Sequence, residues 1–199
     1  MSIAGHDRAT ASTRGGDLLL VAEIDVPSGL RTLQLGPGDA ELADGPDAEV
    51  LVGSLVAPHP AVRALRLRGR SIAKRGLAAR VRDGLVPVGP ESVAGDVSIR
   101  DHLAVVGGTQ RADELLDDAP LLAGRGGEPA GILSGGERRV LGLLRAAALQ
   151  PVVVVLDRAG AGLDDDVLTW AGDLVSGWRR SGIAVVVRPA RVEERSWVS

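Results

Sequence analysis

The residues best suited to bind a ligand stand together at the start of a predicted helix. Ser134, Gly135, Gly136 and Glu137 precede a run of apolar residues at helical spacing. The serine and the two glycines would leave backbone N–H groups open beside the positive end of the helix dipole, an arrangement that binds phosphate. A second interpretation is purely structural, in which Ser134 caps the helix and Glu137 completes a capping box. These four residues alone leave both interpretations open.

The segment after this helix favours the phosphate interpretation. Residues 151–156 include four successive valines, which is typical of a parallel strand buried on both faces, and Asp157, Arg158 and Asp164 follow. Over residues 133–164 the chain resembles, without gaps, the ATP-binding cassette family. That family orders a signature motif (LSGGQ or LSGGE), a helix, a Walker B strand ending in Asp-Glu, and a D-loop. The resemblance implies that Asp157 is the Walker B aspartate, which supports Mg²⁺ in the family, and that Asp164 belongs to the D-loop.

The same resemblance implies a shared nucleotide site. In the family two cassette domains pair head to tail, and each ATP lies between the phosphate loop of one domain and the signature motif of the other. Signature residues 134–137 would then bind a nucleotide held by a partner. The resemblance extends more weakly over residues 17–187. Gly36 and Gly38 lie where we expect a degenerate phosphate loop, and residues 85–91 resemble the Q-loop region.

The groups that hydrolyse ATP in the family are missing from this sequence. A working phosphate loop reads G-x-x-x-x-G-K-[ST], but the only lysine of the chain, Lys74, lies far downstream of Gly36 and Gly38. Asp39 and Glu41 would place negative charge toward a bound phosphate. Arg158 stands where the family has the glutamate that polarises the attacking water, and a cation cannot accept a proton. The Q-loop glutamine, the switch histidine and an adenine-stacking aromatic are missing as well. We therefore predict a chain that does not hydrolyse ATP.

The elements that must position these groups alternate between helix and buried strand. Residues 134–149 and 167–179 have helical spacing, whereas residues 151–156 and 182–187 are apolar runs suited to parallel strands. Residues 17–35 contain two apolar-rich runs separated by Pro-Ser-Gly, which predicts a hairpin. The predicted fold is therefore α/β. It has a P-loop-NTPase-like parallel sheet core flanked by helices, an amino-terminal antiparallel β subdomain and a short helical subdomain.

We expect three regions along the chain. They are a flexible amino-terminal segment over residues 1–16, a cassette domain over residues 17–188 with its helical subdomain at about residues 98–149, and a loosely ordered carboxy-terminal tail over residues 189–199.

The composition narrows the classes of function. The chain has 199 residues, a formal net charge of −3 and no cysteine, which excludes disulfides and thiolate metal sites and gives no basis for nucleic-acid binding. Its apolar runs are shorter than the roughly 18 residues that would predict a membrane span, so we expect no direct membrane insertion. The first residues lack the apolar centre of a signal peptide. These features predict a cytoplasmic protein, either free or peripheral to the inner face of the cell membrane.

Three functional hypotheses follow from the sequence. In the first, the chain is a non-catalytic subunit of an ABC transporter. It supplies its signature motif to a competent ATPase subunit in a heterodimer, binds ATP and Mg²⁺ at a site shared with that partner, and has a membrane permease as a further partner. In the second, the chain is a nucleotide-independent scaffold or regulatory protein on a cassette fold. In the third, it is a divergent active ATPase that uses arginines to neutralise phosphate charge.

Overall fold

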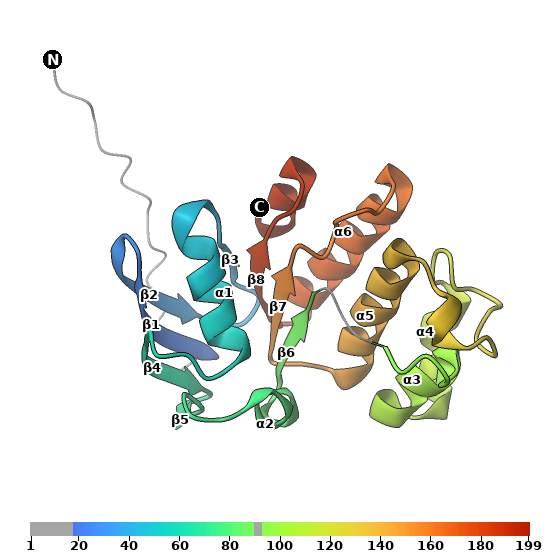
Figure 1. The fold of residues 1–199 in the computed structure, drawn as a ribbon, viewed down its shortest axis with the longest axis horizontal. Helices are drawn as coiled ribbons and strands as arrows, with labels where there is room; N and C mark the ends of the chain where they lie inside the picture. Colours follow the sequence, from blue (N-terminus) through green and yellow to red (C-terminus); the bar gives the residue numbers. More distant parts are fainter. Residues whose placement is uncertain (1–17, 90–92) are drawn as a thin grey trace, which may run out of the picture.

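Two four-stranded sheets form the frame of the protein (Figure 1). The computed structural model describes residues 18–89 and 93–199, and the strands, helices and contacts given below all lie within these residues. The expected flexible segment over residues 1–16 lies outside them. The antiparallel sheet has the order β2-β1-β4-β5, and the parallel sheet has the order β3-β8-β7-β6. The strands are β1 (Leu20–Val26), β2 (Gly29–Leu35), β3 (Ala40–Leu42), β4 (Val62–Leu67), β5 (Arg70–Ser71), β6 (Leu85–Val88), β7 (Val153–Asp157) and β8 (Ala184–Arg188).

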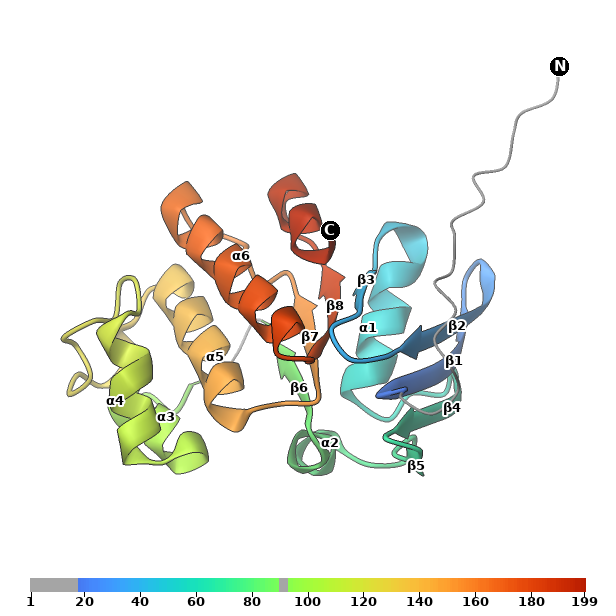
Figure 2. The ribbon, with the colours of Figure 1, turned by 180° about the vertical axis from the view of Figure 1, so that it is seen from behind.

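Helices fill the space between the sheets and cover the far face of the parallel sheet. The α-helices are α1 (Ala48–Val56), α2 (Leu77–Asp83), α3 (Ile99–Gly107), α4 (Thr109–Asp117), α5 (Gly135–Leu149) and α6 (Asp165–Arg180). The short 3₁₀ helices are η1 (Gly45–Asp47), η2 (Ala130–Ile132) and η3 (Val192–Val198). Helix α1 lies between the two sheets, and seen from behind α5 and α6 lie on the opposite face of the parallel sheet (Figure 2). The predicted α/β fold class is confirmed.

Strand β7 shows why the valine run had to be buried on both faces. Val153 and Val155 pack in the core beneath α1, whereas Val154 and Leu156 pack in the core beneath α5 and α6. Side chains alternate between the faces of a sheet, so a strand covered by helices on both sides needs apolar residues at every position. The parallel pairing of β7 with β6 and β8 brings the carboxyl ends of three strands to one edge.

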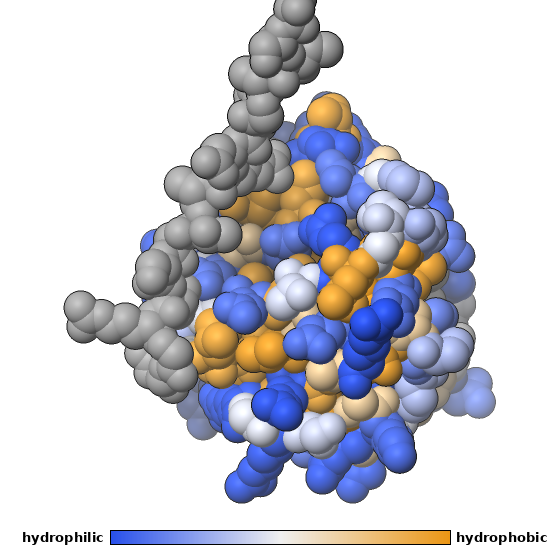
Figure 3. Space-filling model, turned by 90° about the vertical axis from the view of Figure 1, so that its left-hand side faces the viewer, coloured by the Kyte–Doolittle hydropathy of each residue, from blue (hydrophilic) through white to orange (hydrophobic). Residues whose placement is uncertain are grey.

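The predicted amino-terminal hairpin is also confirmed. Strands β1 and β2 pair from Leu20–Leu35 to Val26–Gly29 across the Pro-Ser turn, and β4 pairs with the other side of β1. Leu20, Ala22 and Ile24 are fully buried against α1. On the end of the molecule that this sheet forms, polar and apolar residues are interleaved (Figure 3).

One fully buried arginine joins α2 to α1. The guanidinium of Arg80 donates to the backbone oxygens of Ser54 and Leu55 at 2.7 Å each, and to those of Ala73 and Arg75 at 2.9 Å each. The last carbonyls of a helix have no partner within the helix, so Arg80 satisfies two of them at the end of α1. Burial lowers the pKa of Arg80 through desolvation.

The carboxy-terminal residues correct the sequence prediction. We expected a loosely ordered tail over residues 189–199, but residues 192–198 form η3. Trp197 is 3% exposed and Glu194 is fully buried, so this segment packs into the domain. The prediction was wrong because seven residues with three charges show little local periodicity, and the packing depends on contacts with distant elements.

Candidate functional site

The signature residues form the capped start of helix α5. Ser134 is the N-cap, and its hydroxyl accepts a hydrogen bond from the backbone N–H of Glu137 at 3.3 Å. The Glu137 carboxylate in turn accepts from the backbone N–H of Ser134 at 2.7 Å, which completes the capping box. Ser134 and Gly135 are exposed. The capping box is therefore formed, as the structural interpretation of this motif predicts. The exposed Gly135 also leaves the start of the helix open to a ligand.

An arginine from the preceding loop neutralises Glu137. Arg125 donates to Glu137 through Nη1 and to Glu128 through Nε at 2.9 Å. The backbone hydrogen bond from Ser134 and the ion pair with Arg125 lower the pKa of Glu137. A second arginine, Arg139, donates to the carbonyl of Gly135 at 3.1 Å. Two guanidinium groups thus balance the carboxylates of Glu128 and Glu137, so no net negative side-chain charge opposes an anion at the positive end of α5.

The fold brings residues 160–164, which contain the expected D-loop over residues 161–164 and are called the D-loop segment below, against the signature motif. A Cβ atom added to Gly136 would lie 3.3 Å from the carbonyl oxygen of Gly162, so the second glycine of the motif permits this close approach. Asp164 is the N-cap of α6, and its carboxylate accepts from the backbone N–H of Val167 at 2.9 Å. Two capped and exposed helix starts, α5 and α6, therefore lie side by side on one surface.

Asp157 is tied to an arginine of the neighbouring strand. Arg188 lies directly beside it in the parallel register, and Arg188 Nη1 is 3.4 Å from Asp157 Oδ1. The same guanidinium approaches Glu49, in the first turn of α1, at 3.7 Å. A protein cation thus stands beside the carboxylate that we expected to support Mg²⁺. The described residues contain no group of three carboxylate or imidazole side chains that could hold a metal ion.

Arg158 adopts a conformation that is rare for a residue with a side chain. Its φ angle is +56°, and its backbone N–H donates to the carbonyl of Arg188 at 2.7 Å. The side chain is exposed. The position expected for a catalytic glutamate therefore holds an exposed cation at the sharp turn after β7.

The expected position of the phosphate loop is wrong. Gly36 and Gly38 lie in the turn before β3, whereas a phosphate loop joins a strand to the helix that follows it. Gly38 instead packs against the end of α6, where its carbonyl accepts from Arg179 at 3.2 Å. Asp39 accepts from the backbone N–H of Gly36 at 2.7 Å, and Glu41 pairs with Arg31 at 2.8 Å, so both carboxylates are used locally.

The link that does join a parallel strand to a helix is residues 43–47, between β3 and α1. It is shorter than the roughly eight residues of a phosphate loop and contains no lysine. Asp47, at the start of α1, is 7% exposed and accepts from the backbone N–H of Ser28 at 3.1 Å. Asp44 pairs with Arg195 at 2.8 Å. Carboxylates at the positive end of the helix take the place that phosphate needs, so this link does not fit a nucleotide.

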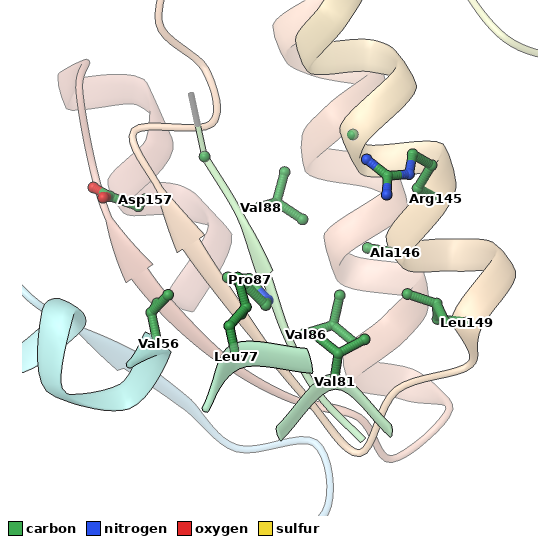
Figure 4. Close-up of a pocket in the computed structure, with 12 residues that line it drawn as sticks. Val56, Leu77, Val81, Val86, Pro87, Val88, Arg145, Ala146, Leu149 and Asp157 are labelled. Atoms are coloured by element: carbon green, nitrogen blue, oxygen red, sulfur yellow. The ribbon is translucent and has the colours of Figure 1, made fainter. Parts of the chain in front are cut away.

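An open pocket of about 430 Å³ lies beside Asp157 (Figure 4). Residues of α2, β6 and α5, including Val81, Val86 and Leu149, give it mostly apolar walls. Its charged lining residues, Asp157 and Arg145, lie on opposite sides of β6 in this view. The first residues of the expected Q-loop region, 85–88, form β6, and residues 86–88 line this pocket. Residues 90 and 91 of that region lie outside the described part of the chain. The apolar walls do not resemble a phosphate site.

Two residues that no sequence motif singled out contact the D-loop segment. Glu194 accepts from the backbone N–H of Gly160 at 3.1 Å, and Arg191 donates to the carbonyl of Leu163 at 2.9 Å. Both belong to the segment that we expected to be a loose tail. The one local signal was the spacing of Glu194 and Trp197, which places a carboxylate and a large apolar side chain on the same side of a helical turn.

Comparisons with known proteins agree with this architecture. No model of a known protein family matches the chain. The chain is 32% identical over 176 residues to the Nod factor export ATP-binding protein I of Burkholderia orbicola, covering 82% of this chain and 55% of the relative. It is 28% identical over 152 residues to the ribose import ATP-binding protein RbsA 2 of Agrobacterium fabrum, covering 67% of this chain and 30% of the relative. The chain thus spans about half, or less, of the length of these relatives.

Solved structures agree on the fold. The structure superposes on a nucleotide-free ATP-binding cassette from an ABC transporter with a TM-score of 0.71 and 14% identity, covering 91% of this chain and 85% of that one. Together with the sequence similarity to the ATP-binding proteins above, this shows that the chain belongs to the ATP-binding cassette family. A second cassette structure, in its ADP conformation, superposes with a TM-score of 0.70 and 13% identity. At these identities the superpositions establish the cassette fold alone.

Proposed function

We propose that this cassette is a non-catalytic domain that supplies its signature helix and D-loop segment to a competent cassette ATPase in a heterodimer. The observation that carries the proposal is an asymmetry within one fold. The surface formed by the starts of α5 and α6 is intact and exposed, whereas the link over residues 43–47 is short, acidic and without lysine. A domain of this kind can complete the nucleotide site of a partner without holding a nucleotide of its own.

ATP and Mg²⁺ would be bound by the phosphate loop of the partner, with Ser134 and Gly135 of this chain closing the site. Backbone N–H groups at the start of a helix bind phosphate oxygens, and Arg139 beside Gly135 adds positive charge. Asp157 would take no part, because Arg188 already neutralises it. The pair would hydrolyse ATP at the partner's residues alone.

A membrane permease would be the further partner of such a pair. The relatives are named for Nod factor export and ribose import, which are transport functions. No helix within residues 18–89 and 93–199 is long and apolar enough to cross a membrane. In this proposal the pair lies in the cytoplasm at the inner face of the membrane, bound to a permease that crosses it, and the transport names of the relatives support that arrangement.

To test the proposal, this chain is mixed with each catalytically competent cassette ATPase of its own organism, and the rate of phosphate release is measured. The wild-type chain should raise the rate of the partner, and Ser134→Arg should abolish that increase because it fills the anion site. Ser71→Arg is a matched control, since Ser71 is exposed on β5 and belongs to the antiparallel sheet. Equal stimulation by Ser134→Arg and by the wild type contradicts the proposal.

A nucleotide-independent scaffold is the second candidate, and the complete capping box favours it. Ser134 and Glu137 satisfy each other's backbone groups without any ligand, so the motif also has a structural use. Isothermal titration with ATP and Mg²⁺ separates the two functions. Uptake of ATP by the mixture beyond that of the partner alone supports the shared site. A stable complex with the partner that takes up no additional ATP supports the scaffold. Hydrolysis of ATP by the chain alone would support a divergent ATPase. The acidic link over residues 43–47, which has no lysine, argues against that outcome.

A further inference from the structure

The short helix η3 is fixed to the body of the domain at its carboxy-terminal end. Trp197 is buried against Gly172 of α6, and its backbone carbonyl accepts from Arg179 Nη1 at 3.1 Å. The Nε of the same arginine donates to the carbonyl of Gly38. Helix η3 is therefore held against α6, and Arg179 of α6 links it to the turn before β3.

At its amino-terminal end η3 carries a fully buried carboxylate that contacts three backbone N–H groups. Glu194 Oε1 accepts from Ala190 at 2.7 Å and from Arg191 at 2.8 Å, which fixes the turn after β8. The other oxygen, Oε2, accepts from Gly160 at 3.1 Å. Hydrogen bonds to an ionised acceptor are about twice as strong as neutral ones, and burial strengthens them further.

Gly160 is the residue that permits this contact. A Cβ atom at this position would lie 2.6 Å from Leu168 Cδ1 and 2.8 Å from the carboxyl carbon of Glu194. Any side chain here would push the backbone away from the carboxylate. The start of the D-loop segment is thus held between α6 and η3.

The far end of the D-loop segment is held by Arg191. Its Nη1 donates to the carbonyl of Leu163 at 2.9 Å, and its Nη2 donates to the carboxylate of Asp165 at 2.8 Å. Between the two held ends, the carbonyl of Gly162 lies against Gly136 of the signature motif. Movement of the D-loop segment would therefore change the surface that we assign to the partner.

We infer that Glu194 and Arg191 are positioning residues that fix the D-loop segment against the signature helix. Through them η3 sets the geometry of the surface that completes the partner's site. The role toward a partner rests on the proposed function, whereas the immobilisation of the D-loop segment is a property of this chain alone.

Two substitutions test the inference. In Glu194→Gln the amide oxygen can replace Oε1 and keep the bonds to Ala190 and Arg191, while the amide nitrogen faces the N–H of Gly160 and breaks that bond alone. Arg191→Gln removes the bond to Leu163 from a partly exposed position and leaves the core intact. Glu193→Gln is the matched control, because Glu193 is exposed on η3 and the amide oxygen of glutamine can still accept from Arg191 Nε, which lies 3.3 Å from Glu193 Oε2.

Hydrogen exchange of the chain alone is the first measurement. In both variants we expect exchange of the amides over residues 160–164 to rise by about tenfold, as loss of one charged hydrogen bond predicts. Exchange in α3 and α4 should stay unchanged, which separates a local effect from general destabilisation. The control should exchange like the wild type. Unchanged exchange over residues 160–164 in both variants, or an equal rise throughout the chain, overturns the inference.

The second measurement is stimulation of the competent cassette ATPase with which the chain pairs. At a saturating concentration of this chain, we expect Glu194→Gln and Arg191→Gln each to lower the stimulated ATPase rate by about tenfold. Glu193→Gln should leave that rate unchanged. Raised exchange with full stimulation would overturn the positioning role. If the wild-type chain itself stimulates no ATPase, the proposed function fails, and the exchange measurement still decides whether η3 holds the D-loop segment.

Discussion

Asp157 and Arg188 stand side by side at the carboxyl ends of two parallel strands, with 3.4 Å between Oδ1 and Nη1. Their side chains are 28% and 24% exposed, so the pair is shielded from solvent but not deeply buried. This edge of an α/β sheet is where ligands usually bind. In this chain an internal cation stands beside the carboxylate expected to support Mg²⁺, whereas the starts of α5 and α6, at the same end of the parallel sheet, remain exposed (Figure 2).

The first prediction concerns Asp157. We expect Asp157→Asn to leave the stimulated rate of the partner within about twofold, because the carboxylate serves an internal ion pair of modest strength. The measurement is phosphate release by the mixture, with Ser134→Arg as the inactive comparison. A loss as large as that of Ser134→Arg would assign Asp157 to the nucleotide site after all.

The second prediction concerns the missing glutamate. Arg158→Glu should not create ATPase activity in the isolated chain, since the link over residues 43–47 still lacks a lysine and carries Asp44 and Asp47. Phosphate release by the purified variant is the measurement, and it should remain at the level of the wild-type chain. Turnover that rises with ATP concentration and saturates would contradict the proposed absence of a nucleotide site of its own.

The third prediction concerns the backbone at the same position. Arg158 has a φ of +56°, a region that costs a residue with a Cβ about 1–2 kcal/mol. Arg158→Gly should therefore raise the free energy of unfolding by about 0.5–1 kcal/mol, after the larger entropy of unfolded glycine is subtracted. Arg66→Gly, at an exposed position of strand β4, should lower it instead. The measurement is the melting temperature of each variant relative to the wild type. A lower melting temperature for Arg158→Gly would contradict the strain argument.

The fourth prediction concerns Arg80. Replacing it with methionine leaves the carbonyls of Ser54 and Leu55 without their partner, and should lower the free energy of unfolding by about 3 kcal/mol. Arg80→Lys should recover only part of the loss, because one ammonium cannot match a planar guanidinium that reaches four carbonyls. Arg82→Met, on the exposed side of the same helix, is the control and should change stability by less than about 0.5 kcal/mol. Full recovery by lysine would contradict this geometry.

The fifth prediction concerns pH. The folded-state pKa of Glu137 is lowered, first by the backbone N–H of Ser134 and then by Arg125. Because this pKa is lowered, the charge of Glu137 stabilises the fold fully at pH values above the pKa of Glu137 in the unfolded chain, about 4.3. The stabilisation is lost as the pH falls from there through the folded-state pKa. The difference in unfolding free energy between wild type and Glu137→Gln should be constant from pH 7 to about pH 5 and shrink under more acid conditions. A difference that grows on acidification would have the wrong sign.

Local patterns in the sequence determined the elements that define this cassette. The Pro-Ser turn between two apolar runs determined the β1–β2 hairpin, and the unbroken valines determined that β7 is buried on both faces. The Ser134–Glu137 spacing determined the capped start of α5. Each of these features follows from neighbours within one turn or one strand, so the composition of a short segment is sufficient.

Contacts between distant segments decided the rest. Strand β3 has only three half-buried residues, so its place in the parallel sheet, and with it the true strand-to-helix link, depends on pairing with β8. The pairing of Arg188 with Asp157 joins residues 31 positions apart, and that of Glu194 with Gly160 joins residues 34 positions apart. A charged residue carries no sequence pattern that names its partner, because only the packing of strands and helices brings the two groups together. The sequence therefore determined which motifs this cassette keeps, and the tertiary structure decided what stands where its own nucleotide would bind.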